Sequence, residues 1–134
     1  MTAQEDAELV RHGYEAFIAG DMEWMNEHLY ENIVWHVPGD NVLSGDYHGR
    51  ENVLAFFAKS MTIALPEFDI HDVVASEDHV VTLLNITWRR NDNGTTLEDK
   101  NVQIFHVSNG QALEVWTMSE DPAKFDQFLE GASA

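Results

Sequence analysis

Cysteine is absent from this chain, and basic residues are scarce. The first absence excludes disulfides, thiol catalysis and cysteine-ligated metal sites. Only 7 Lys and Arg stand against 24 Asp and Glu, which gives a formal net charge of −17. Nucleic acids and anionic membranes both need a basic face, so we expect neither as a partner. A neutral, largely apolar small molecule is the ligand class that this charge hinders least.

Long apolar runs are also missing. No stretch approaches the roughly 20 residues that a membrane span needs. The N-terminus, Met1 to Asp6, is acidic where a signal peptide would be basic and then apolar. We therefore expect a cytoplasmic protein.

What is present indicates one packed domain over residues 1–134. The chain is 44% hydrophobic and contains four Trp, which is typical of a globule and not of a disordered segment. No repeat, low-complexity tract or Pro/Ser linker divides it. A chain of this length can bury enough surface to fold without a metal or a disulfide.

Hydrophobic periodicity and turn residues predict the order α-α-β-α-β-β-β-β-α. Gly20 and Asp21 separate the first two helices, and Pro38-Gly39 ends the first strand. The predicted segments are helices at 3–19, shortly after 21, 50–64 and after 121, and strands at 32–37, 67–75, 79–90, 95–107 and 112–119. Residues 40–49 read as a glycine-rich loop.

Runs of hairpin-linked strands beside segregated helices indicate the α+β class. We predict a strongly curved, mixed but mainly antiparallel sheet that wraps around three helices and encloses an internal pocket.

Several motifs carry a family resemblance over essentially the whole length. They are Tyr14-Glu15-Ala16-Phe17 with Ala19-Gly20-Asp21, Trp35-His36-Val37-Pro38-Gly39, Ser44-Gly45-Asp46-Tyr47-His48-Gly49-Arg50, His106-Val107-Ser108-Asn109-Gly110 and Glu114-Val115-Trp116. In these the chain resembles the NTF2-like superfamily, and within it the SnoaL-like, polyketide cyclase-like proteins. The resemblance implies a cone-shaped cavity. It does not imply one reaction, because the superfamily hosts several activities.

The catalytic sets that the resemblance implies are incomplete here. The base of ketosteroid isomerases falls on Val37, their helical Tyr on Gly13 beside Tyr14, and their second donor on Gln103. The charged relay of limonene-type epoxide hydrolases falls on Leu84-Asn85-Ile86 and near Met118. The acid/base pair of SnoaL-type cyclases is the least contradicted, with Glu120 or Asp121 matching the first group and His106 or His36 the second.

Three residues are the candidates for proton transfer. His36 can exchange protons near neutral pH and lies next to the end of the first strand. Strict alternation would turn it outward if Trp35 and Val37 point inward, whereas a bulge near Pro38 would reverse that. Asp121 is also a helix N-cap, and Glu114 becomes a general base only if its face of the last strand is the inner one.

A wider set of residues is predicted to contact the ligand, with Gln103 as the main neutral hydrogen-bonding group. The predicted substrate-binding residues are Tyr14, Phe17, Trp35, Trp88, Gln103, Phe105, Trp116 and Met118. No spacing of His and carboxylates gives a metal site, and no phosphate loop or dinucleotide motif occurs, so we expect no metal and no cofactor.

Two functions follow as hypotheses. The first is a cofactor-independent acid/base enzyme that performs isomerisation, cyclisation, dehydration or hydrolysis on an apolar cyclic or polyketide-like substrate. The second is a non-catalytic ligand-binding or dimerisation domain. Two titratable groups that face one point in the cavity would favour the enzyme. In either case we expect a homodimer through the outer face of the sheet.

Overall fold

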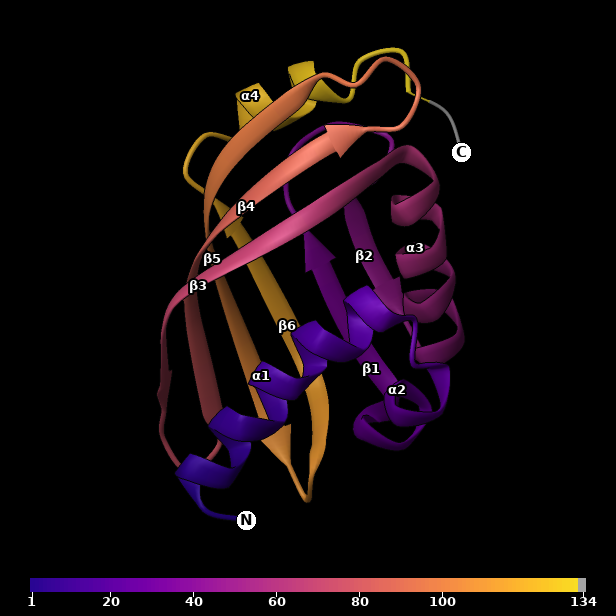
Figure 1. Cartoon of the computed structure of the whole chain (residues 1–134). Helices are drawn as coiled ribbons and strands as arrows, with labels where there is room; N and C mark the ends of the chain where they lie inside the picture. Colours follow the sequence, from indigo (N-terminus) through magenta and orange to yellow (C-terminus); the bar gives the residue numbers. More distant parts are fainter. Residues whose placement is uncertain (133–134) are drawn as a thin grey trace.

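The computed structural model describes residues 1–132 as one curved sheet with helices on its concave side (Figure 1). The helices are α1 (Ala3–Ala19), α2 (Met22–His28), α3 (Arg50–Ile63) and α4 (Pro122–Phe128). The strands are β1 (Leu29–Val37), β2 (Gly45–His48), β3 (Ala64–Ala75), β4 (His79–Arg90), β5 (Thr96–Ser108) and β6 (Gln111–Ser119). None of the helices in the described part is long and apolar enough to cross a membrane.

The strand order is β2-β1-β6-β5-β4-β3. Only β1 and β6 pair in parallel, and every other neighbouring pair is antiparallel. The register shifts between Ile70 and Asp72, where β3 pairs with β4, and such a bulge increases the local bend of a strand. The prediction of a curved, mixed, mainly antiparallel sheet is confirmed.

Two details of the sequence prediction were wrong. Residues 45–48 form the edge strand β2 instead of lying in a loop, because Tyr47 pairs opposite Trp35 and Asp46 opposite His36. The third strand begins directly after α3, at Ala64, so Pro66 lies inside it. Proline is tolerated there because β3 is the edge strand at the far side of the sheet.

The N-terminal helices are closed by local hydrogen bonds. Thr2 and Glu5 form a capping box at the start of α1, and Gly20, at φ 68°, ends the helix in the left-handed conformation. Asp21 then caps α2 by accepting a hydrogen bond from Trp24 N. These turns direct α1 and α2 across the concave face of the sheet.

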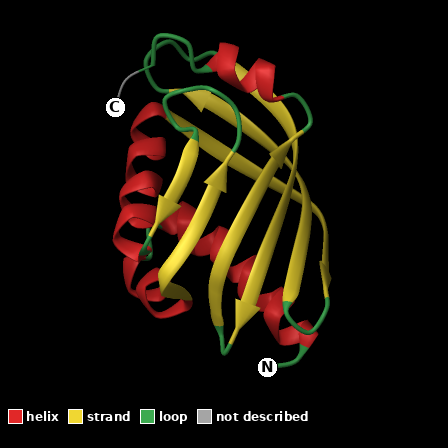
Figure 2. Cartoon of the chain, turned by 180° about the vertical axis from the view of Figure 1, so that it is seen from behind, coloured by secondary structure: helices red, strands yellow, loops and turns green. Residues whose placement is uncertain are grey.

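The core lies between this face and α1 to α3, while α4 packs on β5 and β6 at one end. Its fully buried members are contributed by β1, α3, β4, β5 and β6 and include Ile33, Val53, Val80, Val107 and Val115. No helix among residues 1–132 covers the opposite, convex face (Figure 2). One sheet therefore presents one covered face and one open face.

Replacing Ile33 by Ala should lower the free energy of unfolding by about 2–5 kcal/mol, because a large buried side chain is lost and a cavity remains. Leu65→Ala is the matched control, since Leu65 lies on β3 with 49% of its surface exposed. Urea unfolding of both variants tests this, and similar losses for the two would contradict the assignment of the core.

Candidate functional site

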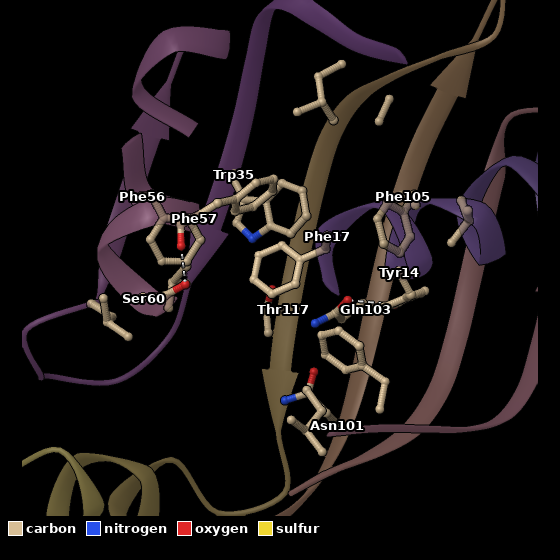
Figure 3. A pocket seen from close by; sticks show the side chains of 18 of the residues that line it. Tyr14, Phe17, Trp35, Phe56, Phe57, Ser60, Asn101, Gln103, Phe105 and Thr117 are labelled. Carbon is tan, nitrogen blue, oxygen red and sulfur yellow. Dashed lines mark hydrogen bonds between the residues drawn. The ribbon is translucent and has the colours of Figure 1, made fainter. Parts of the chain in front are cut away.

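A cavity of about 160 Å³ lies between the concave face of the sheet and the helices (Figure 3). Its wall is largely aromatic, and Figure 3 shows Phe17, Trp35, Phe57 and Phe105 around it. The rings of Trp35 and Phe57 meet edge to face at 5.0 Å, as do those of Phe17 and Phe57 at 5.1 Å. Edge-to-face packing holds these rings in fixed orientations, so the cavity has a defined shape.

A first polar group lies in the middle of the wall, where α1 meets β5. The hydroxyl of Tyr14 donates a 2.6 Å hydrogen bond to Gln103 Oε1. Burial raises the pKa of the Tyr14 phenol above its ordinary value, so the phenol stays protonated and remains a donor. This bond fixes the orientation of the Gln103 amide and leaves its NH₂ group available to the cavity.

A second polar group lies further along β5, toward α4. Asp99 is buried, with 6% of its surface exposed, and lines the cavity. Asn101 Nδ2 donates to Asp99 Oδ2 at 2.9 Å, and Ser119 Oγ donates to Asp99 Oδ1 at 2.7 Å. These three residues form a hydrogen-bonded cluster, the Asp99 cluster, at one end of the cavity.

Three buried polar atoms in the described part of the chain have no hydrogen-bond partner. They are Thr82 Oγ1, Asn101 Oδ1 and Thr117 Oγ1. Asn101 and Thr117 line the cavity, and the register places Thr82 and Thr117 on either side of Gln103. A buried polar atom without a partner costs about 1–3 kcal/mol, and a bound ligand or water can supply the missing bond.

A third titratable side chain, His28, contacts the cavity at the end of α2. Its ring stacks on Trp24 at 4.1 Å, and its Nδ1 lies 2.7 Å from the carbonyl oxygen of Trp24. A carbonyl oxygen only accepts, so Nδ1 carries the proton.

A separate charged cluster lies on the convex face. His36 Nδ1 is 2.6 Å from Asp46 Oδ1, and His36 Nε2 is 2.6 Å from Glu114 Oε2. The ring also stacks on Trp116 at 5.8 Å. These contacts connect β2, β1 and β6, which are consecutive strands of the sheet.

Hydrogen bonds to Glu114 and to Asp46 raise the pKa of His36 above its ordinary value. Both ring nitrogens face carboxylates, which only accept when ionised, so the cluster favours the imidazolium with both nitrogens protonated. Among residues 1–132 no three His, Asp or Glu side chains are arranged to hold a metal ion.

Comparison with known proteins gives the family. The model of the SnoaL-like domain matches residues 10–115, which is most of the chain. The chain belongs to the SnoaL-like family.

The chain is also similar to solved structures and to a curated protein over nearly its whole length. Bal32a, from a soil-derived mobile gene cassette, is 30% identical, with 96% of this chain and 98% of that chain covered and a TM-score of 0.84. An NTF2-like protein from Burkholderia xenovorans LB400 has a TM-score of 0.89 at 21% identity, with 97% and 99% covered. An uncharacterized protein of Mycobacterium tuberculosis (strain ATCC 25618 / H37Rv) is 25% identical, with 96% of this chain and 98% of that protein covered.

Six of the residues predicted to bind substrate line the cavity of this SnoaL-like protein: Tyr14, Phe17, Trp35, Trp88, Gln103 and Phe105. Trp116 and Met118 do not line it. Val115 on the same strand is fully buried in the core, so strand alternation turns Trp116 and Met118 to the convex face, where Met118 is 49% exposed. For these two residues the predicted place in the cavity was wrong.

The three predicted catalytic residues lie outside the cavity lining. His36 and Glu114 do meet, but on the convex face, because Trp35 points inward and no bulge at Pro38 reverses the alternation. Asp121 caps α4 by accepting a hydrogen bond from Lys124 N at 3.3 Å. None of the three is placed to act on a ligand held inside.

The cavity also uses residues that were not predicted from the sequence. Asp99 and Asn101 were assigned no role, although residues 99, 101, 103 and 105 alternate along one strand and must share a face. The comparison with ketosteroid isomerases placed Gly13 at the position of the helical tyrosine. In the structure both Gly13 and Tyr14 line the cavity, and it is Tyr14 that reaches Gln103.

The raised pKa of His36 predicts a pH-dependent contribution to stability. This contribution is fully present below the unfolded value of 6.5 and is lost as the pH rises through the higher folded value. His36→Gln should therefore destabilise the protein more at acidic than at alkaline pH, as measured by urea unfolding across the pH range. The exposed His71 supplies the control variant His71→Gln, for which a similar pH-dependent loss would show that the cluster is not the cause.

Proposed function

We propose that this SnoaL-like protein binds an elongated, mostly apolar small molecule inside the cavity. The observation that carries the proposal is Asn101 Oδ1, a buried acceptor that has no partner in the described chain and belongs to a cavity-lining residue. Apolar walls with a few placed polar groups are typical of small-molecule sites. The aromatic rings would hold the body of the ligand.

The polar groups of the cavity lie in a row, which suggests how the ligand is oriented. The Gln103 amide is a donor in the middle of the cavity, and the Asp99 cluster supplies acceptors at one end. Asp99 and Gln103 are four residues apart on β5, which at about 3.3 Å per residue separates them by roughly 13 Å. A ligand that uses both groups must be long.

Acid/base catalysis is the second candidate, and Asp99 is the observation that favours it. A buried carboxylate beside a bound ligand is suited to accept a proton. The other titratable groups that line the cavity, Tyr14 and His28, lie on α1 and at the end of α2. Since Tyr14 bonds to Gln103, which is four residues from Asp99 along β5, the two titratable groups do not face one point. Binding is therefore the better supported function.

Thr117→Leu should weaken ligand binding by roughly tenfold or more, because the larger side chain fills the cavity. It should not lower the stability, since it also removes a buried hydroxyl that has no partner. Binding of the neutral apolar dye N-phenyl-1-naphthylamine, followed by its fluorescence, measures the effect.

Thr87→Leu is the control, because it makes the same change on β4 at a residue outside the cavity lining. If the wild-type protein does not bind the dye, or if both variants bind it equally well, the cavity is not the binding site.

The homodimer expected from the sequence stays a prediction, and the convex face supports it. That face carries no helix, and an apolar row of cross-strand partners crosses it: Val74, Val81, Ile104 and Trp116. A second copy of the chain can bury such a row in a symmetric interface.

The cytoplasmic location expected from the sequence likewise stays a prediction.

Ile104→Asp should convert the dimer to a monomer, because it places a charge in the middle of this row. The control Asn85→Asp adds the same charge at an exposed position of β4 and should leave the dimer intact. Light scattering after size-exclusion chromatography measures the mass of each. A monomeric wild-type protein at tens of micromolar would end this hypothesis.

A further inference from the structure

Asp99 is a buried carboxyl group whose two oxygens both accept hydrogen bonds. Asn101 Nδ2 can only donate, and it donates to Asp99 Oδ2. Ser119 Oγ donates to Asp99 Oδ1 at 2.7 Å and accepts a hydrogen bond from Asp121 N at 3.2 Å. Both oxygens of Asp99 therefore have neutral donors as their hydrogen-bond partners.

The Asp99 carboxyl group has no cationic partner in the described chain. None of the ion pairs among residues 1–132 includes Asp99, so no Lys, Arg or His nitrogen lies within 4.0 Å of it. The contrast with His36 is clear, because that cation meets two carboxylates on the convex face. A buried charge that is bound only by neutral donors is costly, and an opposite charge brought by a ligand would offset the cost.

The second acceptor at this end of the cavity is Asn101 Oδ1, which is buried and has no partner. Its orientation is determined, because a flipped amide would place its oxygen against the Asp99 carboxylate. Asn101 Oδ1 lies close to Asp99 Oδ2, because the amide group that carries Oδ1 donates a 2.9 Å hydrogen bond to Oδ2. Ser119 Oγ and one N–H of Asn101 Nδ2 already donate to Asp99, which leaves the second N–H of that amide. The acceptors, Asn101 Oδ1 and the two oxygens of Asp99, outnumber this donor, so a ligand group that donates is favoured at this end.

The surroundings favour a cation as that donor. Trp88 and Phe125 line the same cavity, with ring centroids 5.9 Å apart, and the faces of aromatic rings attract ammonium groups. A surface pocket adjoins Asp99 and is lined by Glu98, Glu120 and Asp121 against the single cation Lys124. The net charge of −17 attracts cations to the protein from a distance.

We propose that the ligand carries a protonated amine, and that its ammonium group binds between Asp99 and Asn101 while its apolar body fills the aromatic part of the cavity. An ammonium supplies several N–H donors and the missing positive charge together, whereas a hydroxyl supplies one donor and no charge. This inference rests on the proposed binding function and adds the chemical class of the ligand.

A matched pair of probes tests the proposal on the wild-type protein. The probes are 4-phenylbutylamine and 4-phenylbutan-1-ol, which differ only in the terminal group. Titration at neutral pH is followed by the NMR signals of the indole N–H groups. Signals of Trp35 and Trp88 should shift, whereas that of Trp116, outside the cavity, should not. The amine should bind roughly tenfold more tightly, because its hydrogen bonds to the carboxylate are charge-assisted.

Two variants assign the preference to Asp99. Asp99→Asn should abolish the preference for the amine, while Glu98→Gln, which removes a charge from the neighbouring pocket, should keep it. A preference that persists in folded Asp99→Asn would overturn the proposal. If that variant does not fold, the wild-type comparison decides alone.

The outcomes separate this inference from the binding function. Equal affinity of the two probes, with shifts of Trp35 and Trp88 for both, would overturn the amine proposal and leave the binding function standing. Failure of both probes and of the apolar dye to bind would overturn both.

Discussion

The alternation of side chains between the two faces of one curved sheet is the constraint on which this structure depends. Along β1, Trp35 points into the cavity and His36 away from it. Along β6, Val115 lies in the core while Glu114 and Trp116 belong to the convex face. Because neighbouring strands are held in register, the orientation of the side chains on one strand determines which residues of the other strands lie on each face.

This constraint separates two kinds of electrostatic environment that are close in sequence. On the convex face, His36 binds two carboxylates, so positive and negative charges compensate each other near solvent. On the concave face, Asp99 has only neutral donors among the described residues. The first arrangement stabilises the junction of three strands, whereas the second leaves a carboxyl group whose charge a ligand can compensate. A site for a ligand arises where the fold itself does not satisfy its polar groups.

Much of the fold was predictable because its signals are local. Gly20 with Asp21, Pro38 with Gly39, and Asp121 with Pro122 ended or began elements where expected, since capping and proline geometry act within one turn of the chain. β2 was missed because a four-residue strand has too short an alternation of apolar and polar residues. Its pairing with β1, with Tyr47 opposite Trp35, becomes visible in the fold. The candidate site was half predictable. Tyr14, Gln103 and the aromatic rings were recognised, but Asp99 and Asn101 look like solvent-exposed polar residues when read one at a time.

The sequence by itself determined the order of the elements, the turns between them, and which residues of each strand share a face. Only the tertiary structure decided which of the two faces is concave. That choice depends on where α1 to α3 pack, and the contacts that determine it join residues far apart in the chain, such as Tyr14 and Gln103, which are separated by 89 positions. For the same reason only the folded chain shows that Asp99 is buried and that His36 is on the outside, because burial is a property of the assembled layers and not of a strand.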